Sequence, residues 1–295
     1  MKPVDFDTWS RTQLDSVESA LSAWVPSAAP AGLGQAMRYG VLDGGKRLRP
    51  LLVLAAAHAV NGQGEASLRA ACAVELIHAY SLVHDDMPCM DNDVLRRGKP
   101  TVHVQFGEAQ AMLAGDAMQA LAFEVLTPEQ GVPSALQAQL CSLLARSAGH
   151  AGMAGGQAID LASIGVSLDE QALRDMHHRK TGALLQASVL MGAACGESSA
   201  GAWQALADYG DAIGLAFQVV DDILDVTQAS ETLGKTAGKD INNNKPTYVT
   251  VLGLAAARRH ARELREKAQA ALARSSLVDA TWLAELADRV VDRDC

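Results

Sequence analysis

Apolar residues recur at helical spacing along almost the whole chain, with polar residues filling the positions between them. This period places the apolar side chains on one face of an α-helix, where they can pack against a core. Helices are expected at residues 6–24, 32–41, 48–60, 65–86, 104–127, 133–150, 168–193, 200–226, 246–273 and 278–290. Turn-forming segments such as NGQG (61–64) and TPEQGVP (127–133) separate them. The pattern therefore predicts an all-α fold.

Domain organisation follows from what interrupts this pattern. No alternating apolar and polar stretch of useful length predicts a strand, and no Pro/Ser-rich linker divides the chain. The longest polar interruption, QASETLGKTAGKDINNNKPT, covers residues 228–247. Long irregular segments within compact domains are often functional lids. We therefore expect residues 1–295 to form a single domain.

The composition agrees with a helical protein, because alanine and leucine are abundant and aromatic residues make up only 4% of the chain. Hydrophobic residues make up 49%, which is enough for a large buried core. The formal net charge of -9 argues against nucleic acid or an anionic membrane surface as a partner. Basic residues with a function must therefore be clustered.

The cysteines and the N-terminus bear on the cellular compartment. No CxxC pair occurs among Cys72, Cys89, Cys141, Cys195 and Cys295. This pattern favours neither a zinc site nor a disulfide framework. The N-terminal stretch is acidic and amphipathic, unlike a signal peptide. No uncharged apolar run reaches the roughly 18 residues that a membrane span needs. We therefore expect a cytoplasmic protein without a membrane span.

A first cluster of aspartates ends an apolar stretch in SLVHDDMPCMDNDVLRR, residues 81–97. Crowded carboxylates repel one another unless a cation neutralises them, and they are the ligands that a hard divalent metal prefers. On an unbroken helix Asp85 and Asp91 would lie on nearly opposite faces. Pro88 disfavours continued helix before it, so the chain can bring Asp91 back beside Asp85. His78 lies on the same helix face as Asp85, two turns deeper.

A second cluster, FQVVDDILD, spans residues 217–225. On a helix Gln218, Asp221, Asp222 and Asp225 fall within about 100° of one another. The surrounding residues are apolar, so this helix is expected to be mostly buried, with one polar stripe. Buried or cleft-facing carboxylates need a counter-charge. The stripe is therefore a second candidate metal site, with an exposed helix face as the alternative.

Basic residues gather in four segments of this acidic protein. They are Lys46, Arg47 and Arg49; Arg96, Arg97 and Lys99; Arg179 and Lys180; and Lys235, Lys239 and Lys245. Each group alone is ordinarily surface charge. Together with two carboxylate clusters, they indicate a substrate rich in phosphate, whose oxygens can bridge metal ions and arginines.

Five segments together resemble the trans-isoprenyl diphosphate synthases (trans-prenyltransferases), and in particular the bacterial farnesyl diphosphate synthases. They are GGKRLRP (44–50), ELIHAYSLVHDDMPCMDNDVLRRGKPTVH (75–103), KTG (180–182), GLAFQVVDDILDVT (214–227) and LGKTAGKDINNNKPTY (233–248). All stand in family order. One small departure is Val249, where many members have proline, and it leaves the site untouched.

The resemblance implies about ten or more mostly antiparallel helices around a central cavity, in a homodimer. It also implies three Mg²⁺ ions, with Mn²⁺ as an alternative. By position in the motifs, Asp85, Asp86 and Asp91 would hold two ions, and Asp221 the third, with Asp225 acting through water.

Two diphosphate sites are implied in the same way. The allylic diphosphate would be bound by Arg96, Lys180, Lys235 and Lys245. Isopentenyl diphosphate would be bound by Lys46, Arg49, His78 and Arg97, with Gly45 allowing close backbone approach. Thr181 and Gln218 would line the reacting carbons.

The implied reaction condenses dimethylallyl or geranyl diphosphate head to tail with isopentenyl diphosphate. It proceeds by metal-assisted ionisation, condensation and elimination, and it gives (E,E)-farnesyl diphosphate and diphosphate. A geranylgeranyl (C20) product is the alternative within the family. A terpene cyclase shares the helical fold and a DDxxD motif, but Lys46, Arg49 and Arg97 argue against it.

The residues before Asp85 bear on product length. In this family an aromatic residue at the position of Tyr80 forms the floor of the cavity and stops growth at fifteen carbons. Helix geometry puts Ser81 on the face of Asp85, whereas Tyr80 is offset by about 140°. We expect Tyr80 to close the cavity, because its ring is large and rigid enough to block a growing chain, and packing in the core as an ordinary tyrosine is the alternative.

Overall fold

Helices form most of the structure, a computed structural model that describes residues 5–42, 44–62, 64–166, 168–227, 246–277 and 279–292. The first half contains α1 (Phe6–Trp24), α2 (Leu33–Val41), α3 (Leu48–Ala59), α4 (Glu65–Asp85), α5 (Val102–Phe106), α6 (Glu108–Leu126) and α7 (Ser134–Ala148). The second half contains α8 (Met153–Ala162), α9 (Glu170–His177), α10 (Ala183–Ala194), α11 (Ala200–Thr227), α14 (Tyr248–Leu252), α15 (Leu254–Ala273) and α16 (Thr281–Val291). The predicted all-α fold is confirmed.

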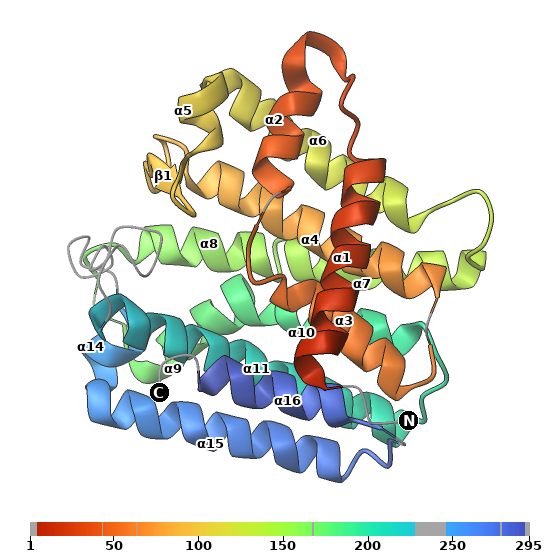
Figure 1. The fold of residues 1–295 in the computed structure, drawn as a ribbon. Coiled ribbons are helices and arrows are strands. Elements are labelled where there is room, and N and C mark those ends of the chain that lie inside the picture. The colour runs from red at the N-terminus through yellow and green to blue at the C-terminus, as the bar shows by residue number, and fades with distance from the viewer. Residues whose placement is uncertain are drawn as a thin grey trace.

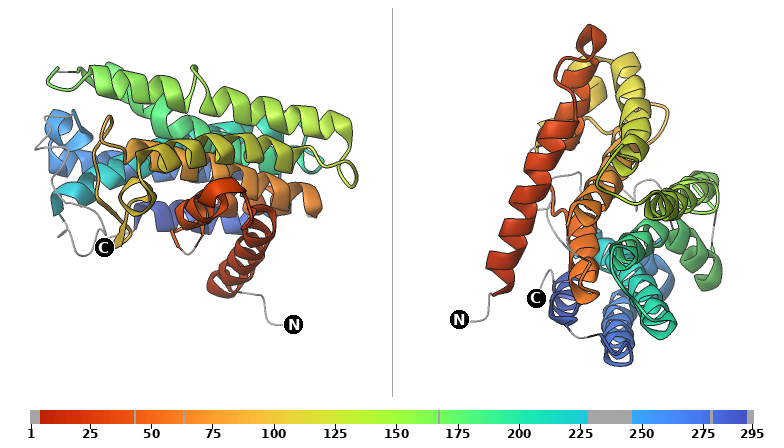
Figure 2. Two further views of the ribbon diagram at one scale, coloured as in Figure 1. Left: turned by 90° about the horizontal axis from the view of Figure 1, so that it is seen from above. Right: turned by 90° about the vertical axis from the view of Figure 1, so that its right-hand side faces the viewer.

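Most of the long helices run side by side, as the end-on view in the right panel of Figure 2 shows. In Figure 1, α15 lies along the bottom of the molecule and α2 and α5 at the top, while α1 crosses in front of the others. The most extensive contacts join α4 to α6, α11 to α15, and α10 to both α3 and α11. These contacts leave α4 and α11, which carry the two aspartate clusters, on either side of the α3–α10 pair.

Side-chain caps fix where several helices begin. Asp5 accepts the backbone N–H of Thr8 at the start of α1, and Asp169 accepts that of Ala172 at the start of α9. Thr247 opens α14 with a capping box. These side chains satisfy N–H groups that have no partner within the helix.

Two predicted helices are broken by a glycine that takes a positive φ angle. Gly107 (φ 88°) separates α5 from α6 within the expected helix 104–127, and Gly253 (φ 82°) separates α14 from α15 within 246–273. Side chains rarely adopt this backbone conformation, so glycine ends one helix and starts the next at a new angle. A third expected helix, 168–193, is interrupted by a π-helical turn, His178–Gly182.

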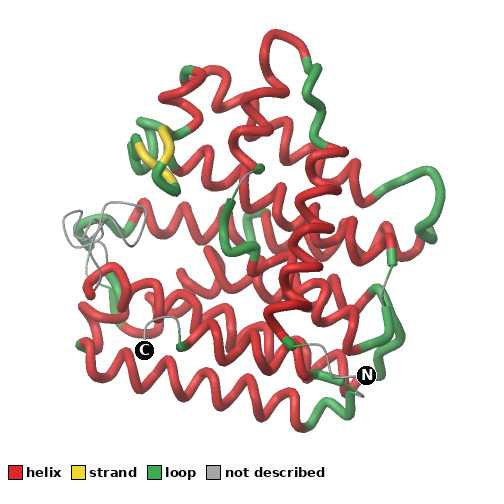
Figure 3. The backbone as a smooth tube through the Cα atoms, viewed as in Figure 1, coloured by secondary structure: helices red, strands yellow, loops and turns green. Residues whose placement is uncertain are grey.

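The structure also contains elements that helical periodicity does not predict. A short antiparallel hairpin pairs Leu95–Arg96 (β1) with Lys99–Pro100 (β2), the yellow segment in Figure 3. Helix α8 forms in the glycine-rich stretch 152–162, which has low helix propensity. Packing explains α8, because a Cβ at Gly156 would lie 2.2 Å from the backbone nitrogen of Lys180. Glycine here lets α8 approach the π-helical turn.

One contiguous cluster of buried residues runs from α1 to α16. Within this cluster the Tyr209 hydroxyl donates to the Leu283 carbonyl at 2.7 Å, which joins α11 to α16. By length and composition alone, α4 is the one described helix that could span a membrane. However, 67% of the residues in its most apolar 18-residue stretch are buried inside the protein. Core helices of water-soluble proteins pass the same test.

Candidate active site

A cavity of about 450 Å³ opens between α3, α4, α8, the π-helical turn and α11. Its apolar wall comprises Leu82, Met90, Met153, Ala154, Ala158, Leu161 and Phe217. Its polar lining comprises Arg49, His78, Tyr80, Ser81, His84, Asp85, Gln157, Lys180, Thr181, Gln218 and Asp221. The size is within the range of ligand-binding pockets. One carboxylate from each aspartate cluster therefore faces the same cavity.

The first aspartate cluster folds back on itself as the proline predicts. Helix α4 ends at Asp85, and the backbone N–H of Asp91 then donates to the Asp85 carbonyl at 2.8 Å. The pKa of Asp85 is raised to about 6, chiefly by burial and also by the nearby Asp91 carboxylate, while Lys180 acts in the opposite direction. An ionised Asp85 is thus destabilised unless a cation joins it.

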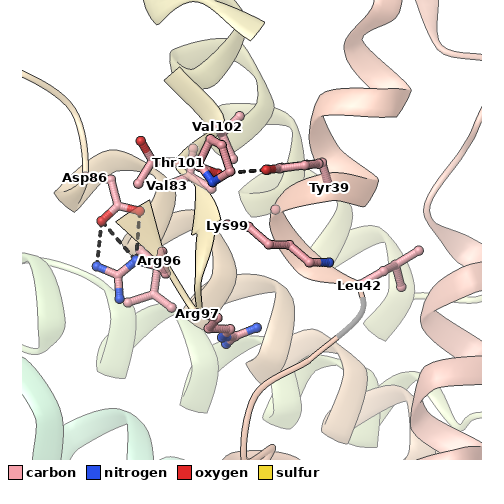
Figure 4. A pocket seen from close by; sticks show the side chains of 12 residues that line it. Tyr39, Leu42, Val83, Asp86, Arg96, Arg97, Lys99, Thr101 and Val102 are labelled. Atoms are coloured by element: carbon pink, nitrogen blue, oxygen red, sulfur yellow. Dashed lines mark hydrogen bonds and ion pairs between the residues drawn. The ribbon is translucent and has the colours of Figure 1, made fainter. Parts of the chain in front are cut away.

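Asp86 takes a different environment from its neighbour. It is only 2% exposed, and both of its carboxylate oxygens accept from Arg96, whose Nε lies 2.9 and 2.8 Å away (Figure 4). These two residues line a small separate pocket under the β1–β2 hairpin, together with Arg97, Lys99 and Tyr39. Asp86 and Arg96 therefore form an ion pair beside the main cavity. The predicted roles of Asp86 in metal binding and of Arg96 in allylic diphosphate binding stay predictions.

The second aspartate cluster divides in the same manner. Asp221 lines the cavity, whereas Asp222 and Asp225 are buried, at 2% and 5% exposed. The expected single polar stripe facing the cleft is therefore limited to Gln218 and Asp221. The roles of Asp221 and Asp225 as metal ligands stay predictions.

A chain of hydrogen bonds fixes the side chains predicted to line the reacting carbons. The Thr181 hydroxyl donates to Gln218 Oε1 at 2.9 Å, and Gln218 Nε2 donates to Asp222 Oδ1 at 2.8 Å. The other Asp222 oxygen accepts the backbone N–H of Tyr248 at 2.7 Å. Asp222 thus sets which way the Gln218 amide points, and through it the direction of the Thr181 hydroxyl.

Lys180 reaches the cavity from the π-helical turn. Its Nζ lies 2.6 Å from Oδ2 of Asp160, a carboxylate on α8 that is 4% exposed. π-Helical turns are uncommon and occur frequently at functional sites. Lys180 lies close enough to Asp85 to lower the pKa of that carboxyl. A single ammonium group therefore stands between the α8 and α4 carboxylates.

The two arginines of the GGKRLRP segment are both buried but have different neighbours. Arg49 lines the cavity, whereas Arg47 pairs with Glu18 on α1 and with Glu75 on α4. The Arg47–Glu75 contact is 2.5 Å long. Arg47 therefore joins three helices, and Lys46 lies exposed on the segment before α3.

Gly45 and Arg97 are in direct contact. The Arg97 guanidinium donates to the Gly44 carbonyl at 2.7 Å, and a Cβ on Gly45 (φ 100°) would lie 2.6 Å from that guanidinium. Nearby, burial and surrounding arginines, Arg49 first among them, lower the pKa of His78 well below its usual value. His78 is therefore a neutral hydrogen-bonding group in an electropositive corner.

Tyr80 and Ser81 both line the cavity. The Ser81 hydroxyl donates to the His78 carbonyl one turn back, at 2.8 Å. The Tyr80 ring meets the His84 ring edge-on, with centroids 5.7 Å apart. Tyr80 is therefore part of the cavity wall, and its predicted function as a floor stays a prediction.

Some residues were missed or cannot be placed. Sequence reasoning missed Asp160 because it stands alone in a glycine-rich stretch, and it took Asp222 for a member of the metal stripe. The contact with Tyr248, from a distant segment, is one feature that distinguishes Asp222 from Asp221. The predicted ligands Lys235 and Lys245 lie outside the described residues.

The donor set fits a metal that is shared with a substrate. Within the described ranges, no group of three or more His, Cys, Asp or Glu side chains could hold a metal ion alone. Mg²⁺ typically takes one or two protein carboxylates and completes its shell with water and substrate phosphates. Asp85, with its raised pKa, and Asp221 meet that requirement at the cavity wall.

Known proteins resemble the chain over nearly its whole length. The family model for polyprenyl synthetase matches residues 30–282. A chloroplastic geranylgeranyl pyrophosphate synthase of Capsicum annuum is 44% identical over 295 residues, 99% of this chain and 80% of that protein.

Two solved structures have the same fold. An FPP/GFPP synthase from Zymomonas mobilis has a TM-score of 0.86 and 40% identity, and the match covers 97% of this chain and 98% of that one. A geranyltransferase from Helicobacter pylori, complexed with magnesium and isoprenyl diphosphate, has a TM-score of 0.85 and 34% identity over 99% and 98% of the two chains. The resemblance in the aspartate, KTG and GGKRLRP motifs is thus confirmed over the whole fold, and the chain belongs to the polyprenyl synthetase family of trans-prenyltransferases.

Proposed function

We propose that the protein condenses an allylic diphosphate with isopentenyl diphosphate to give a longer all-trans prenyl diphosphate and diphosphate. The observation that carries this proposal is the arrangement of Asp85, Asp221 and Lys180 around one cavity, part of whose wall is apolar. Carboxylates and an ammonium group suit a metal-bound diphosphate, and the apolar wall suits a prenyl chain. Family membership supports the same reaction.

Mg²⁺ would be held by Asp85 and Asp91 on one side and by Asp221 on the other, with Asp86 joining if Arg96 releases it. When bound, the metal supplies positive charge that stabilises the leaving diphosphate. The magnesium in the Helicobacter pylori geranyltransferase supports this assignment. The number of three ions remains part of the proposal.

The chain's own residues bind and orient the two substrates. Lys180 neutralises charge on the allylic diphosphate, and Arg49 and His78 bind the diphosphate of isopentenyl diphosphate. Thr181 and Gln218, held by Asp222, direct two polar oxygens toward the reacting carbons. Alignment of the isopentenyl double bond with the allylic carbon supplies much of the rate enhancement. The apolar wall excludes water, which would otherwise trap the allylic cation.

Two product lengths have support. The similarity to geranylgeranyl pyrophosphate synthases, at 44% identity over 99% of the chain, favours a C20 product over the C15 product that the sequence predicts. Tyr80 in the cavity wall is the observation that supports C15, because its ring can block a growing chain. Both candidates share the site and differ only in the depth that the cavity allows.

We also propose a cytoplasmic homodimer. Several of the large apolar side chains that are exposed lie on or beside the hairpin and on α5 and α6: Val94, Leu95, Val104, Met112 and Leu113, at 58%, 53%, 50%, 40% and 53% exposed. Apolar patches of this kind commonly mark protein interfaces. A second copy would cover them, and sedimentation of the protein would reveal its oligomeric state.

The experiment that tests the proposed reaction measures diphosphate release. Release should require both dimethylallyl diphosphate and isopentenyl diphosphate, together with Mg²⁺. A terpene cyclase would release diphosphate from a single allylic substrate, and a phosphohydrolase would release inorganic phosphate. Either of these results would overturn the proposal.

A further inference from the structure

His84 connects the cavity wall to helix α6. Tyr80 and His84 lie one turn apart on α4, and both line the cavity. Their rings meet at an interplanar angle of 74°, with centroids 5.7 Å apart. This edge-to-face geometry is favourable for aromatic pairs. The Tyr80 ring therefore packs against the His84 ring, one turn further along α4.

The position of His84 is itself fixed by α6. Its Nε2 lies 3.0 Å from the Met112 carbonyl, and because a carbonyl can only accept, that nitrogen carries the hydrogen. Asp116 lies 4.0 Å from the same nitrogen. A carbonyl within a helix retains a lone pair for such a bond.

Gly115 makes room for this contact. A Cβ at Gly115 would lie 2.1 Å from His84 Nε2 and 2.5 Å from its Cδ2. Gly115 is an ordinary helical glycine in the middle of α6, where glycine costs helix stability relative to alanine. The space that it leaves is filled by the His84 ring, so α6 has a notch shaped to that ring.

We propose that His84, seated in the notch at Gly115, is a positioning residue that holds the Tyr80 ring in the cavity wall and thereby sets the length of the product. The inference rests on the proposed function, since it assumes that a prenyl chain grows toward Tyr80. A tyrosine side chain turns about two torsions, and a ring held on one side blocks the chain more consistently than one free to swing. Product length then depends on packing between α4 and α6 as well as on Tyr80.

Two substitutions at His84 separate the ring from the hydrogen bond. His84→Gln keeps an N–H near the position of Nε2 but removes the ring, whereas His84→Phe keeps a ring beside Tyr80. His84→Gln should raise the ratio of products one isoprene unit longer to the parental product by roughly two- to tenfold, the factor that loss of one aromatic pair gives. His84→Phe should leave that ratio within about twofold of the parent.

The chain offers a matched control in His58. It is partly buried like His84, its Nε2 lies 3.2 Å from a carboxylate oxygen of Asp279, and its ring centroid lies 6.3 Å from that of Trp282. It does not line the cavity. His58→Gln should therefore leave the product ratio unchanged, which separates positioning from a general loss of stability.

Gly115→Ala tests the notch from the other helix. The added methyl forces the His84 ring away from α6, toward Tyr80 and the cavity, so products should become shorter rather than longer. In a Tyr80→Ala background, His84→Gln should not alter product length any further. Gly115→Ala carries the test alone if circular dichroism shows that His84→Gln does not fold.

The outcomes test the positioning role of His84 separately from the role of Tyr80 as the cavity floor. If Tyr80→Ala leaves product length unchanged, the cavity floor lies elsewhere and the role of Tyr80 is wrong. If Tyr80→Ala lengthens the product while His84→Gln and Gly115→Ala do not change it, the positioning role of His84 is wrong. A shift of the ratio in His58→Gln equal to that in His84→Gln would also overturn the inference.

Discussion

The carboxylate of Asp222 accepts the backbone N–H of Tyr248 at 2.7 Å, and its second oxygen accepts the side-chain amide of Gln218. Tyr248 begins α14, so this contact joins α14 to α11 across the buried base of the site. The second aspartate of the DDILD motif therefore acts through Gln218 and does not line the cavity as Asp221 does.

Asp222→Asn should lower turnover while leaving the Mg²⁺ requirement unchanged. Gln218 Nε2 and the Tyr248 backbone N–H donate to different oxygens of Asp222. Asparagine has an NH₂ group in place of one oxygen, so one of these two donors would face another donor. A hydrogen bond to a charged group contributes enough that a loss of roughly tenfold or more in kcat is expected. Turnover against Mg²⁺ concentration checks this, with Asp221→Ala as comparison. A half-saturating Mg²⁺ concentration raised equally in both variants would make Asp222 a metal ligand.

Asp85→Ala and Asp221→Ala should each lose most turnover in Mg²⁺ and remain folded. Removing one carboxylate from a crowded anionic site relieves repulsion, so the helical content seen by circular dichroism should be retained. Steady-state rates with saturating substrates measure the loss. Wild-type turnover in either variant would mean that its cluster has no part in the reaction.

Asp85 should also make stability depend on pH. Burial raises its pKa from 3.8 to about 6, so the folded state favours the protonated carboxyl. Its contribution to stability is therefore present below about pH 4 and is lost as the pH rises through about 6. At about 1.4 kcal/mol per pKa unit, the ionised form costs at most about 3 kcal/mol.

Asp85→Asn mimics the protonated form and checks this dependence. In EDTA, urea unfolding should find the variant more stable than the parent at pH 8, and the difference should vanish near pH 4. Glu124→Gln, an exposed carboxyl on α6, serves as control and should have little effect at either pH. A variant no more stable than the parent at pH 8 would contradict the assigned environment of Asp85.

Arg47 and Arg49 should behave differently although they lie two positions apart. Arg47→Ala leaves Glu75 buried without its partner, so it should reduce the free energy of unfolding by about 3–5 kcal/mol. Arg49→Ala, like Lys46→Ala, should chiefly raise KM for isopentenyl diphosphate. Urea unfolding and steady-state kinetics separate the two effects. Similar losses of stability in Arg47→Ala and Arg49→Ala would contradict this division.

Lys180→Ala should instead impair the allylic substrate. Its ammonium group lies in the cavity wall on the side of Asp85 and Asp160. Kinetics with each substrate varied in turn should show KM rising for dimethylallyl diphosphate and changing little for isopentenyl diphosphate. If Lys180→Ala and Arg49→Ala changed the two KM values in the same way, the proposal that they bind different diphosphates would be wrong.

Much of the architecture follows from local sequence. Helical spacing predicts the long helices, and Pro88 predicts the fold-back that joins Asp91 to Asp85, because both effects act within a few residues. Helical spacing predicts continuous helix through Gly107 and Gly253, since glycine is tolerated in helices and only the backbone φ angle reveals the break. Helix α8 was missed because its low propensity is outweighed by packing of Gly156 against the π-helical turn.

The sequence predicts which residues belong to the candidate site better than it predicts the direction in which their side chains point. Asp85, Lys180, Thr181, Gln218 and Asp221 all line one cavity as the motifs suggest. Whether a carboxylate faces a cavity or a buried partner depends on segments far away in the chain. The Arg96 guanidinium donates to the Asp86 carboxylate, and the backbone N–H of Tyr248 donates to the Asp222 carboxylate. Neither contact has a signal in helical periodicity.

Product analysis of the wild-type protein tests the central claim most directly. The purified protein is incubated with dimethylallyl diphosphate, radiolabelled isopentenyl diphosphate and Mg²⁺, and the products are dephosphorylated and separated by chain length. The account predicts a linear all-trans C15 or C20 alcohol, formed with one diphosphate released for each isopentenyl unit added. Cyclic hydrocarbons, or the absence of any labelled prenyl product from a folded protein, would contradict it.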